Sequence, residues 1–562
     1  MADVSRNSQQ RRRLPSRCSP GRLLLVLALV TGVLATTVAA DEPVAAEGVE
    51  QHDQIPAAEI SEFVRELIGR QMIVTAVKPR VRRGEIHVDI TCQPNSKNVV
   101  WLILFNQMDE DYQHSAQEYQ TQGLVQELHE TVRFNRNTYH TSMWVQSDDD
   151  AVGLKLPDGR LPEAGTAALW SAPVDELMRR FLTDNRLPGA TIALSWNGDV
   201  VYDRAFGYAD VRAQTAMHPA SVMRIASLSK PITATAVLQL VERGRLRLDD
   251  PVLPLLRQNG VLTDVPPADP RWGQIQLRHL LQHTGGMAPP DDFDPMFQSG
   301  WLANQLGQQR AVTAVDVIRY QASQPLQFTP GMREAYSNVG YNILGRVIES
   351  ATGLTYEQYV RRRILDPAGM KSTRPGRTRV KDRAVDEVTY HTQRDSKVLP
   401  FWLGQQRAAE LVRNTELVPE PYGRWDLEMM DADSGWTSTS ADLLRFVARL
   451  EAPDQPLISS ESFRIMRQAP AHVDPATTFT WYGFGWNVRT AGAEDGYSLW
   501  HIGSLAGTSS LLFRRSDGFA GAVLFNCDTN PQGRQAATEL EPLIHQLLND
   551  LSPPQVSVSR PD

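Results

Sequence analysis

Alternation of apolar and polar residues predicts antiparallel β-strands at both ends of the segment from about residue 167 to 551. The predicted strands cover 190–196, 200–207, 482–488, 497–502, 509–514 and 520–525. Asn197-Gly198 between the first two strands is a strong hairpin signal. Helices are predicted from Val174, over about 534–551, and through most of 231–442. Strands at both ends with helices between them indicate an α+β fold, in which an antiparallel sheet is flanked by helices and joined to a helical lobe.

A weaker pattern recurs between residues 41 and 150. The segments 83–93 and 136–146 carry arginine, histidine and glutamine at the same relative places, and each alternates apolar and polar residues around a turn. A helical pattern precedes each segment, at 60–68 and at 109–119. Two helix-plus-hairpin units in succession predict a small tandem-repeat domain ahead of the main fold.

The first forty residues have the pattern of a targeting segment. Arg11, Arg12, Arg13, Arg17 and Arg22 precede an apolar run over 23–35, and Val38-Ala39-Ala40 then looks like a signal-peptide cleavage site. The apolar run is shorter than the roughly 20 residues that span a bilayer. We therefore expect a signal peptide over 1–40, cleaved near Ala40, and an exported protein that is periplasmic or secreted. An uncleaved N-terminal anchor, with association to the cell envelope, is the alternative.

The length and net charge of the chain limit the number of folded units and the kind of partner. A chain of 562 residues is too long for one compact core, so we expect two or more folded units. The expected parts are the signal peptide (1–40), the repeat domain (41–150), an acidic linker with glycine and proline (151–166), the main domain (167–551) and a disordered tail (552–562). The net charge of -8 argues against nucleic acid as a partner, because nucleic-acid binders present a basic surface.

The cysteines and histidines predict neither a disulfide nor a metal site. Cys18 would leave with the signal peptide, and Cys92 and Cys527 lie far apart in the chain, so we expect buried free thiols. The chain has no Cys/His spacing of the zinc type and no His-Glu-x-x-His motif. We expect no metal and no cofactor.

Ser227 and Lys230 are the first candidates for chemistry. A helix is predicted to open directly after Ala226, and residues three apart on a helix share a face, so the lysine amine can lie beside the serine hydroxyl. The positive end of the helix disfavours the ammonium and favours negative charge on the serine oxygen. Lys230 is the only lysine between Lys155 and Lys371, and a lysine, unlike an arginine, can lose its proton and act as a base. The pair predicts an activated serine nucleophile.

Tyr336-Ser337-Asn338 is the second candidate segment. A tyrosine close to an ammonium can have a lowered pKa and can accept or return a proton. Asn338 can hydrogen-bond a substrate amide or the lysine. The alternative is a plain helix start, with Ser337 or Asn338 as the cap and Tyr336 packed in the core.

His501-Ile502-Gly503-Ser504 is the third segment, and it lies on a predicted strand. Gly503 lets a substrate backbone come close, and the Ser504 N–H can join the Ser227 N–H as an oxyanion hole. A histidine that only packs in the strand is the alternative for His501.

Together the three segments resemble the active site of the serine β-lactamase and penicillin-binding-protein superfamily. The resemblance is to its class C-like branch, which includes esterases, D-aminopeptidases and D-Ala-D-Ala carboxypeptidases, and it spans about 174–548 in motif order and separation. Further segments that look like this family are Arg224-Ile225-Ala226, Leu277-Arg278-His279-Leu280-Leu281, His283-Thr284-Gly285-Gly286, Gly340-Tyr341 and Ser438-Thr439-Ser440. The resemblance implies a nucleophile (Ser227), a base and acid pair (Lys230, Tyr336), a substrate-orienting amide (Asn338), a residue in the place often held by lysine (His501) and two oxyanion-hole amides (Ser227, Ser504).

Two departures from the family pattern bear on the substrate. A neutral histidine at His501 binds a carboxylate less well than the usual lysine, and Ile502 stands where threonine is usual, which predicts a more apolar pocket. Both favour an esterase or a D-amino-acid peptidase that acts on a small-molecule or peptide substrate. A true β-lactamase and a catalytically silent binding protein are the alternatives. An α/β-hydrolase would need Gly-x-Ser-x-Gly, which the chain lacks.

The region ahead of the main domain carries a looser likeness. It resembles the short tandem-repeat modules found ahead of some bacterial and fungal serine hydrolases, which implies a spacing or substrate-docking role.

Overall fold

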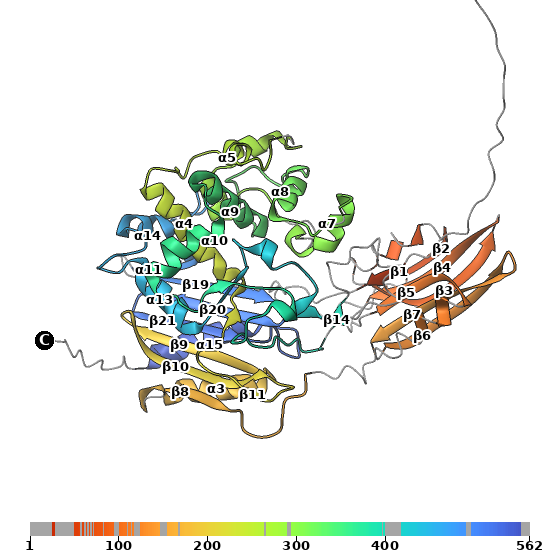
Figure 1. Ribbon diagram of the computed structural model, residues 1–562, viewed down its shortest axis with the longest axis horizontal. Coiled ribbons are helices and arrows are strands. Elements are labelled where there is room, and N and C mark those ends of the chain that lie inside the picture. The colour runs from red at the N-terminus through yellow and green to blue at the C-terminus, as the bar shows by residue number, and fades with distance from the viewer. Residues whose placement is uncertain are drawn as a thin grey trace, which may run out of the picture. The chain divides into compact units, whose positions relative to one another are not determined.

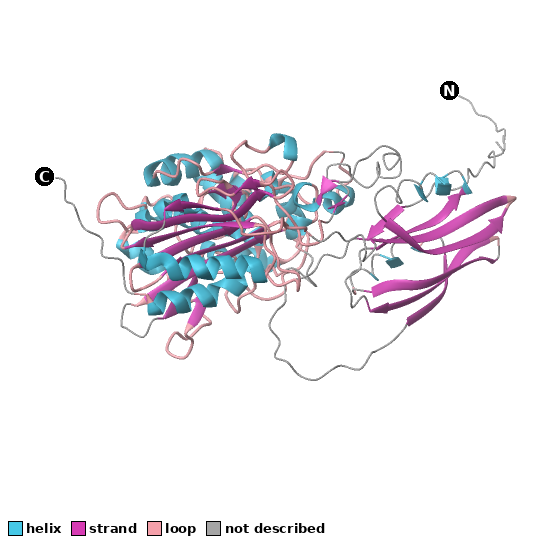
Figure 2. Cartoon of the chain, turned by 90° about the horizontal axis from the view of Figure 1, so that it is seen from below, coloured by secondary structure: helices cyan, strands magenta, loops and turns pink. Residues whose placement is uncertain are grey.

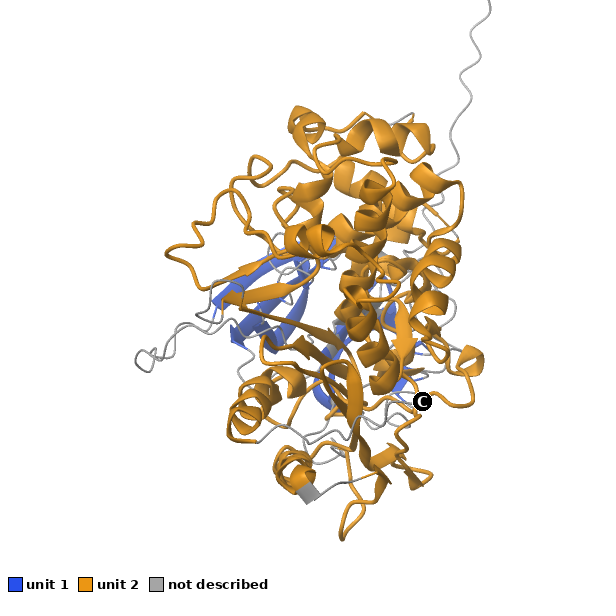
Figure 3. Cartoon of the chain, turned by 90° about the vertical axis from the view of Figure 1, so that its left-hand side faces the viewer, with its two compact units in different colours: residues 1–31, 41–148 blue, residues 32–40, 149–562 orange. Residues whose placement is uncertain are grey.

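The computed structural model contains two compact units, which are coloured separately in Figure 3. Unit 1 comprises residues 1–31 and 41–148, and unit 2 comprises residues 32–40 and 149–562. The described residues are 25–28, 50–146 with short gaps, and 154–551 apart from 167–168, 264–265, 289–293, 309, 396, 399–417 and 491–495. Most of the predicted signal peptide and the predicted tail lie outside them. No helix within these described ranges is long and apolar enough to cross a membrane.

Unit 1 holds two antiparallel sheets. Their strands run in the orders β2-β4-β3 and β1-β5-β7-β6. In chain order they are β1 (Leu25–Ala28), β2 (Glu50–Pro56), β3 (Met72–Arg82), β4 (Glu85–Pro94), β5 (Trp101–Met108), β6 (Leu124–Phe134) and β7 (Asn137–Gln146). The pairs β3–β4 and β6–β7 are hairpins, and their second strands carry the two similar sequence segments. Residues of both sheets, among them Val74, Val88, Ile103 and Met143, share one core. The tandem repeat itself stays a prediction.

Unit 2 is built on a nine-stranded antiparallel sheet. Its order is β11-β10-β9-β21-β20-β19-β18-β17, and β8 also pairs with β10. The strands are β8 (Glu163–Thr166), β9 (Gly189–Trp196), β10 (Asp199–Asp210), β11 (Thr215–Ala216), β17 (Thr480–Tyr482), β18 (Asn487–Thr490), β19 (Tyr497–Leu505), β20 (Thr508–Arg514) and β21 (Phe519–Phe525). The two ends of the domain sequence meet where β9 pairs with β21. The predicted hairpin at Asn197-Gly198 joins β9 to β10.

Helices cover both faces of this sheet (Figures 1 and 2). On one face, α3 (Ala172–Asp184) and α15 (Ala536–Asp550) enclose a core with residues of β9, β20 and β21. On the other face lie α4 (Ser229–Glu242), α13 (Ser440–Leu450) and the lobe. The lobe and its edges contain α5 (Val252–Gln258), α6 (Leu277–Leu281), α7 (Ser299–Gln305), α8 (Ala314–Ala322), α9 (Asn338–Thr352), α10 (Tyr356–Val360), α11 (Asp366–Ala368) and α14 (Ser460–Met466). This arrangement confirms the predicted α+β fold.

Helix α4 is the centre of unit 2. Every residue from Ser229 to Leu240 is buried, which is the pattern of a helix with neighbours on all sides. A polar side chain at its first turn is therefore held away from bulk solvent. Three short strands lie nearby, β12 (Met223–Arg224), β16 (Trp436–Ser438) and β13 (Arg374–Pro375), and they form a small sheet of their own. A further pair is β14 (Lys397–Val398) with β15 (Val418–Pro419).

Two sequence expectations for this unit were wrong. The strand predicted over 482–488 is two strands, β17 and β18, because the chain turns sharply between them. Gly485 has φ 79° there, and a Cβ would lie 2.9 Å from the Ala234 side chain and 3.0 Å from the Lys230 carbonyl oxygen, so only glycine fits against α4. The end of the predicted linker is strand β8, because Glu163 pairs with Arg204 at 2.7 Å and the backbone joins β10.

Candidate active site

Ser227 lies in a tight turn that leads into α4. The 3₁₀ helix η2 (Ala226–Leu228) follows β12, and Ala226 has φ 49°, a left-handed conformation that costs energy for any residue but glycine. The turn is held by hydrogen bonds from Ser229 Oγ to the Ala226 carbonyl (2.7 Å) and from the Ile225 N–H to the Trp436 carbonyl (3.0 Å). Ala226 and Leu228 are buried while Ser227 is partly exposed. The strained turn therefore presents the hydroxyl of Ser227 to solvent.

Lys230 lies directly behind Ser227, as the helical spacing predicts. Its Nζ donates to Ser227 Oγ (3.1 Å), Asn338 Oδ1 (2.7 Å) and the Asp433 carbonyl oxygen (3.2 Å). The side chain is completely buried, and this burial lowers the pKa of Lys230 from 10.5 to about 8, against the opposing fields of Asp433 and Asp294. A tenth or so of the lysine is then neutral at pH 7. This is the electrostatic state that a general base requires.

Asn338 joins Lys230 to a buried carboxylate. It is the first residue of α9, whose N-cap is Ser337, with Oγ accepting from the Gly340 N–H (3.2 Å). Asn338 Oδ1 accepts from Lys230, and Nδ2 donates to Asp294 Oδ2 (2.7 Å). Ser337 is therefore the helix cap, and its neighbour Asn338 contacts Lys230.

Tyr336 lies over Lys230 and reaches the open side of the site. Lys230 Nζ is 4.7 Å from the centre of its ring, and 41 % of the side chain is exposed. Burial of its hydroxyl raises the pKa of Tyr336 well above 10, although the hydrogen bond with Ser227 lowers it. Solvent at the exposed ring moderates this rise. The expected lowering of the Tyr336 pKa was wrong, because desolvation, with the charges of Asp433 and Asp294, outweighs the hydrogen bond with Ser227. The group is a phenol at neutral pH.

His501 is buried beside Tyr482. Its side chain is 2 % exposed, and Nδ1 lies 2.8 Å from the Ile502 carbonyl oxygen, which can only accept, so Nδ1 carries the proton. Nε2 then accepts from the Tyr482 hydroxyl at 2.9 Å. Burial and the Lys230 charge lower the pKa of His501 to about 3. The histidine is therefore neutral and supports the wall of the site through Tyr482.

Gly503 brings β19 against the turn that carries Ser227. A Cβ there would lie 2.4 Å from Ser510 Oγ, 2.5 Å from the Ile225 carbonyl oxygen and 3.0 Å from the Ser227 nitrogen. Only glycine allows this approach. Ser504, the other residue expected to supply an oxyanion-hole amide, follows Gly503 on the same strand.

Ile502 does not line the site. Side chains alternate along a strand, and Ile502 packs with Trp500 against the core on the α15 face, while Leu499 and Leu505 pack on the α4 face. The expectation that Ile502 makes the pocket apolar was wrong for this reason.

Four further side chains at the site were not assigned a role from the sequence: Asp294, Asp433, Tyr482 and His283. His283 Nδ1 accepts from the Ser337 N–H (3.1 Å), and its ring packs against Tyr336 (4.2 Å between centres) and Tyr482 (4.3 Å). Its pKa is lowered well below 6.5 by burial. His283 stands in a segment that resembles the family, whereas Asp294, Asp433 and Tyr482 stand in no local pattern that distinguishes them from ordinary core or loop residues.

Substitution of Gly503 by alanine is expected to lower stability by about 1–3 kcal/mol and kcat by about 10²-fold. The new Cβ must displace either β19 or the Ser227 amide. Thermal unfolding and kcat with an ester substrate measure the two effects. Gly340→Ala is the matched control, because a Cβ at Gly340 meets nothing closer than 3.7 Å and should leave both quantities nearly unchanged. Wild-type kcat in Gly503→Ala would contradict the close packing of β19 on the turn that carries Ser227.

Comparison with known families agrees with this geometry. The sequence model described as Beta-lactamase matches residues 174–546, which is most of the chain. The chain belongs to the beta-lactamase family. Penicillin-binding protein 4* of Bacillus subtilis (strain 168) is 28 % identical over 324 residues, covering 57 % of this chain and 64 % of that protein. Esterase EstB of Burkholderia gladioli is 35 % identical over 183 residues, covering 31 % of this chain and 44 % of the esterase. The match thus spans less than two thirds of either relative.

Solved structures show the same fold. D-amino acid amidase from Ochrobactrum anthropi SV3, in complex with L-phenylalanine, superposes with a TM-score of 0.51 at 22 % identity, over 67 % of this chain and 100 % of the amidase. EstCE1, a hydrolase with promiscuous acyltransferase activity, superposes with a TM-score of 0.51 at 22 % identity, over 66 % of this chain and 97 % of its own. Relatives in the beta-lactamase family are serine hydrolases, with penicillin-binding proteins and an esterase among them.

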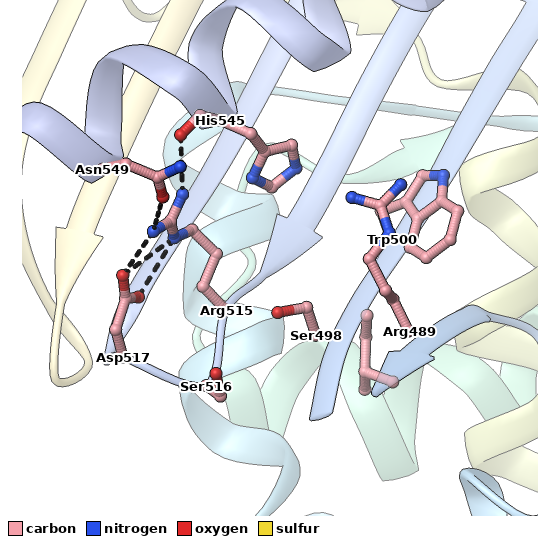
Figure 4. A pocket seen from close by; sticks show the side chains of 9 residues that line it. Arg489, Ser498, Trp500, Arg515, Ser516, Asp517, His545 and Asn549 are labelled. Carbon is pink, nitrogen blue, oxygen red and sulfur yellow. Dashed lines mark hydrogen bonds and ion pairs between the residues drawn. The ribbon is translucent and has the colours of Figure 1, made fainter. Parts of the chain in front are cut away.

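A separate cavity of about 230 Å³ lies on the other face of the beta-lactamase-family sheet (Figure 4). Arg489, Trp500, Arg515 and His545 line it, and Arg515 is bound by Asp517 at 2.6 Å. Trp500 precedes His501 on β19 but points to the opposite face. The cavity is therefore not part of the Ser227 site.

The cysteines and one cluster of possible metal ligands lie outside the Ser227 site. Cys92 and Cys527 are free and buried, as predicted. In the described part of the chain, Glu50, His52 and Cys92 of unit 1 place ligand atoms within 4.8 Å of one another. The carboxylate of Glu50 is already engaged by His52 (3.1 Å) and by Arg70, so these residues satisfy one another.

Proposed function

We propose that this protein is an exported serine hydrolase that forms an acyl-enzyme on Ser227 from small esters or amides. The observation that carries the proposal is the contact of Ser227 Oγ with a buried lysine, at 3.1 Å, whose pKa is lowered to about 8. A serine hydroxyl is a poor nucleophile unless such a base lies beside it. The similarity to an esterase and to a penicillin-binding protein supports the same chemistry.

Acylation uses the site in the following way. Neutral Lys230 takes the proton of Ser227, and Ser227 Oγ attacks the carbonyl carbon of the substrate. The N–H groups of Ser227 and Ser504 stabilise the negative charge that develops on the carbonyl oxygen. Tyr336, a phenol with a raised pKa, donates a proton to the leaving alkoxide or amine and regains one from the Lys230 ammonium.

Hydrolysis of the acyl-enzyme reverses these roles. Water replaces the leaving group, and the Lys230–Tyr336 pair removes its proton as it attacks the ester carbonyl. The bond between Ser227 Oγ and the acyl carbon then breaks, and Ser227 regains its proton from the Lys230–Tyr336 pair. Asn338, which contacts Lys230 at 2.7 Å, holds the amine in place through both steps.

The substrate class follows from the charge of the site. His501 is neutral and buried, so it offers no cation to a substrate carboxylate at the position where the family often has lysine. A charge-assisted hydrogen bond contributes about 1.5–3 kcal/mol, or roughly 10- to 100-fold in affinity. Neutral esters and amides are therefore favoured over β-lactam antibiotics, which carry such a carboxylate.

A matched pair of substrates measures this preference. We expect kcat/KM for the methyl ester of nitrocefin to equal or exceed that for nitrocefin itself, because methylation removes only the carboxylate charge. Short p-nitrophenyl esters and D-amino-acid p-nitroanilides complete the ranking. Faster turnover of nitrocefin than of its methyl ester and of all the other substrates would instead establish a β-lactamase.

Labelling with a fluorophosphonate probe tests the function as a whole. We expect stoichiometric modification of the native protein on the peptide that contains Ser227, and none after heat denaturation, because the reactivity depends on the folded lysine. Modification of another serine would show a different mechanism. No labelling and no turnover of any of these substrates would show a silent binding protein.

Export belongs to the proposal and rests on the arginine-rich, apolar N-terminus. N-terminal sequencing of the protein recovered from the producing cell, expected to begin at Asp41, tests it.

A further inference from the structure

Lys230 has a complete set of hydrogen-bond acceptors. An ammonium has three N–H donors, and three acceptors surround Nζ: Ser227 Oγ, Asn338 Oδ1 and the Asp433 carbonyl oxygen. When the proton is lost, two N–H groups and one lone pair remain. The lone pair faces Ser227 only if the other two acceptors keep their hydrogens.

Of these two acceptors, only Asn338 can change its character. The Asp433 contact is a backbone carbonyl within a buried segment and always accepts. The amide of Asn338 has an acceptor end and a donor end, and rotation by 180° would exchange them with almost no change of shape. The donor end would then bind the lone pair of Lys230 and withdraw it from Ser227.

Asp294 decides which end faces the lysine. Its Oδ2 accepts from Asn338 Nδ2 at 2.7 Å, and a carboxylate can accept but not donate, so the rotated amide would set two acceptors against each other. Asp294 is itself fixed, because its Oδ1 accepts from the Met296 N–H at 2.9 Å as the N-cap of η5 (Pro295–Phe297).

We propose that Asp294 is a positioning residue that locks the Asn338 amide and thereby aims the lone pair of Lys230 at Ser227. The inference rests on the proposed function, in which Lys230 is the base. Asp294 touches neither the serine nor the substrate carbonyl in this scheme. It acts through two hydrogen bonds, from Lys230 to Asn338 and from Asn338 to Asp294.

Asp433 provides a matched comparison. It too is a buried carboxylate, and its charge, like that of Asp294, raises the pKa of Lys230. Its Oδ2 accepts from Ser434 Oγ (2.7 Å), and its Oδ1 has no hydrogen-bond partner among the described residues. Its contact with Lys230 is through the backbone carbonyl. Asp294→Asn and Asp433→Asn therefore each remove one carboxyl group beside Lys230, but only the first frees the amide.

Titratable groups from several elements surround Lys230. They are Asp294, Asp433, Tyr336, Tyr341, His283 and His501. The two histidines are neutral and the two tyrosines are phenols at neutral pH, so the two aspartates dominate the shift that either variant causes. Burial raises the pKa of both carboxyls, that of Asp433 to about 7, so the two variants are compared on the plateau at high pH.

The experiment measures the second-order rate of fluorophosphonate labelling of the full chain between pH 6 and 10. Either variant should move the acid limb to lower pH, because loss of a negative charge lowers the pKa of Lys230. In Asp294→Asn the plateau rate at high pH should also fall, by roughly tenfold more than in Asp433→Asn, because the lone pair is no longer aimed. A purely structural effect would lower the rate at every pH without this difference.

A double variant that exchanges the residues at positions 294 and 338 should restore part of the lost labelling rate. Asp294→Asn combined with Asn338→Asp keeps a hydrogen bond between the two positions and gives Lys230 an acceptor that cannot rotate into a donor. The plateau should recover at least about threefold over Asp294→Asn alone, while the acid limb moves to higher pH, because a carboxylate now contacts the lysine. Circular dichroism and thermal unfolding verify that each variant is folded.

The outcomes separate this inference from the proposed function. Equal plateaus in Asp294→Asn and Asp433→Asn, or no recovery in the double variant, would overturn the role of Asp294 while leaving the serine hydrolase in place. If the wild-type protein is not labelled on Ser227 at all, the proposed function fails first.

Discussion

Replacement of Ser227 by alanine is expected to lower kcat/KM for p-nitrophenyl acetate by about 10⁴-fold or more. The change removes one oxygen, and with it the atom that forms the acyl-enzyme. The turn should persist, because its hydrogen bonds come from Ile225, Ser229 and Trp436 and not from the Ser227 hydroxyl. Steady-state kinetics and the loss of fluorophosphonate labelling measure the effect, and the melting temperature should stay within a few degrees of the wild type.

Ser498→Ala is the matched control for this substitution. Ser498 lies on β19, the strand that carries His501 and Gly503, but lines the cavity on the opposite face. Its removal should leave kcat/KM within about twofold of the wild type. A Ser227→Ala protein with more than a tenth of wild-type activity would mean that another group is the nucleophile.

Replacement of Lys230 by arginine is expected to lower kcat/KM by roughly 10³-fold, which lies within the range for loss of a general base. Arginine keeps the positive charge but cannot lose its proton at any accessible pH. In the wild type, burial lowers the pKa of Lys230 to about 8, so activity should rise with pH through that value and level off above it. The residual activity of Lys230→Arg should lack this limb.

Lys230→Met supplies the control for size and charge. It fills the same buried space without a charge and should be equally inactive, while arginine must fit a larger head group into a fully enclosed site. Agreement between the two variants assigns the loss to the missing base and not to misfolding. Wild-type pH dependence in either variant would exclude Lys230 as the base.

The pairing of Ser227 with Lys230 could be predicted because it is local. Residues three apart on a helix lie on one face whatever the rest of the fold does, and the distance of 3.1 Å follows from that geometry. The alternation that marks β9, β10, β20 and β21 is local in the same sense, so these strands were found close to their true bounds. The break between β17 and β18 was missed because it depends on the approach of α4 to Gly485.

The resemblance to a known family brought Tyr336, Asn338, His501 and Gly503 to the site by motif order, and the structure shows where each one lies and what surrounds it. The pKa of Tyr336 is raised and His501 is buried, and both are consequences of how much protein surrounds each group. Burial is a property of the packed chain and cannot be predicted from the neighbouring residues in the sequence. The side on which Ile502 lies depended on strand phase, which the register of β19 with β20 sets.

The sequence by itself determined the α+β class, the proximity of Ser227 and Lys230, and the segments that meet around them. These features depend on periodicity and on short-range spacing, which are the same however the remainder of the chain packs. Only the tertiary structure decided the electrostatics of the site. Asp294 and Asp433 come from loops 64 and 203 positions away from Lys230 in the chain numbering, and their fields, with complete burial, set the pKa of the lysine. Such long-range contacts leave no local pattern in the sequence. A buried carboxylate can be identified only from the partner that it contacts, and not from its neighbours in sequence.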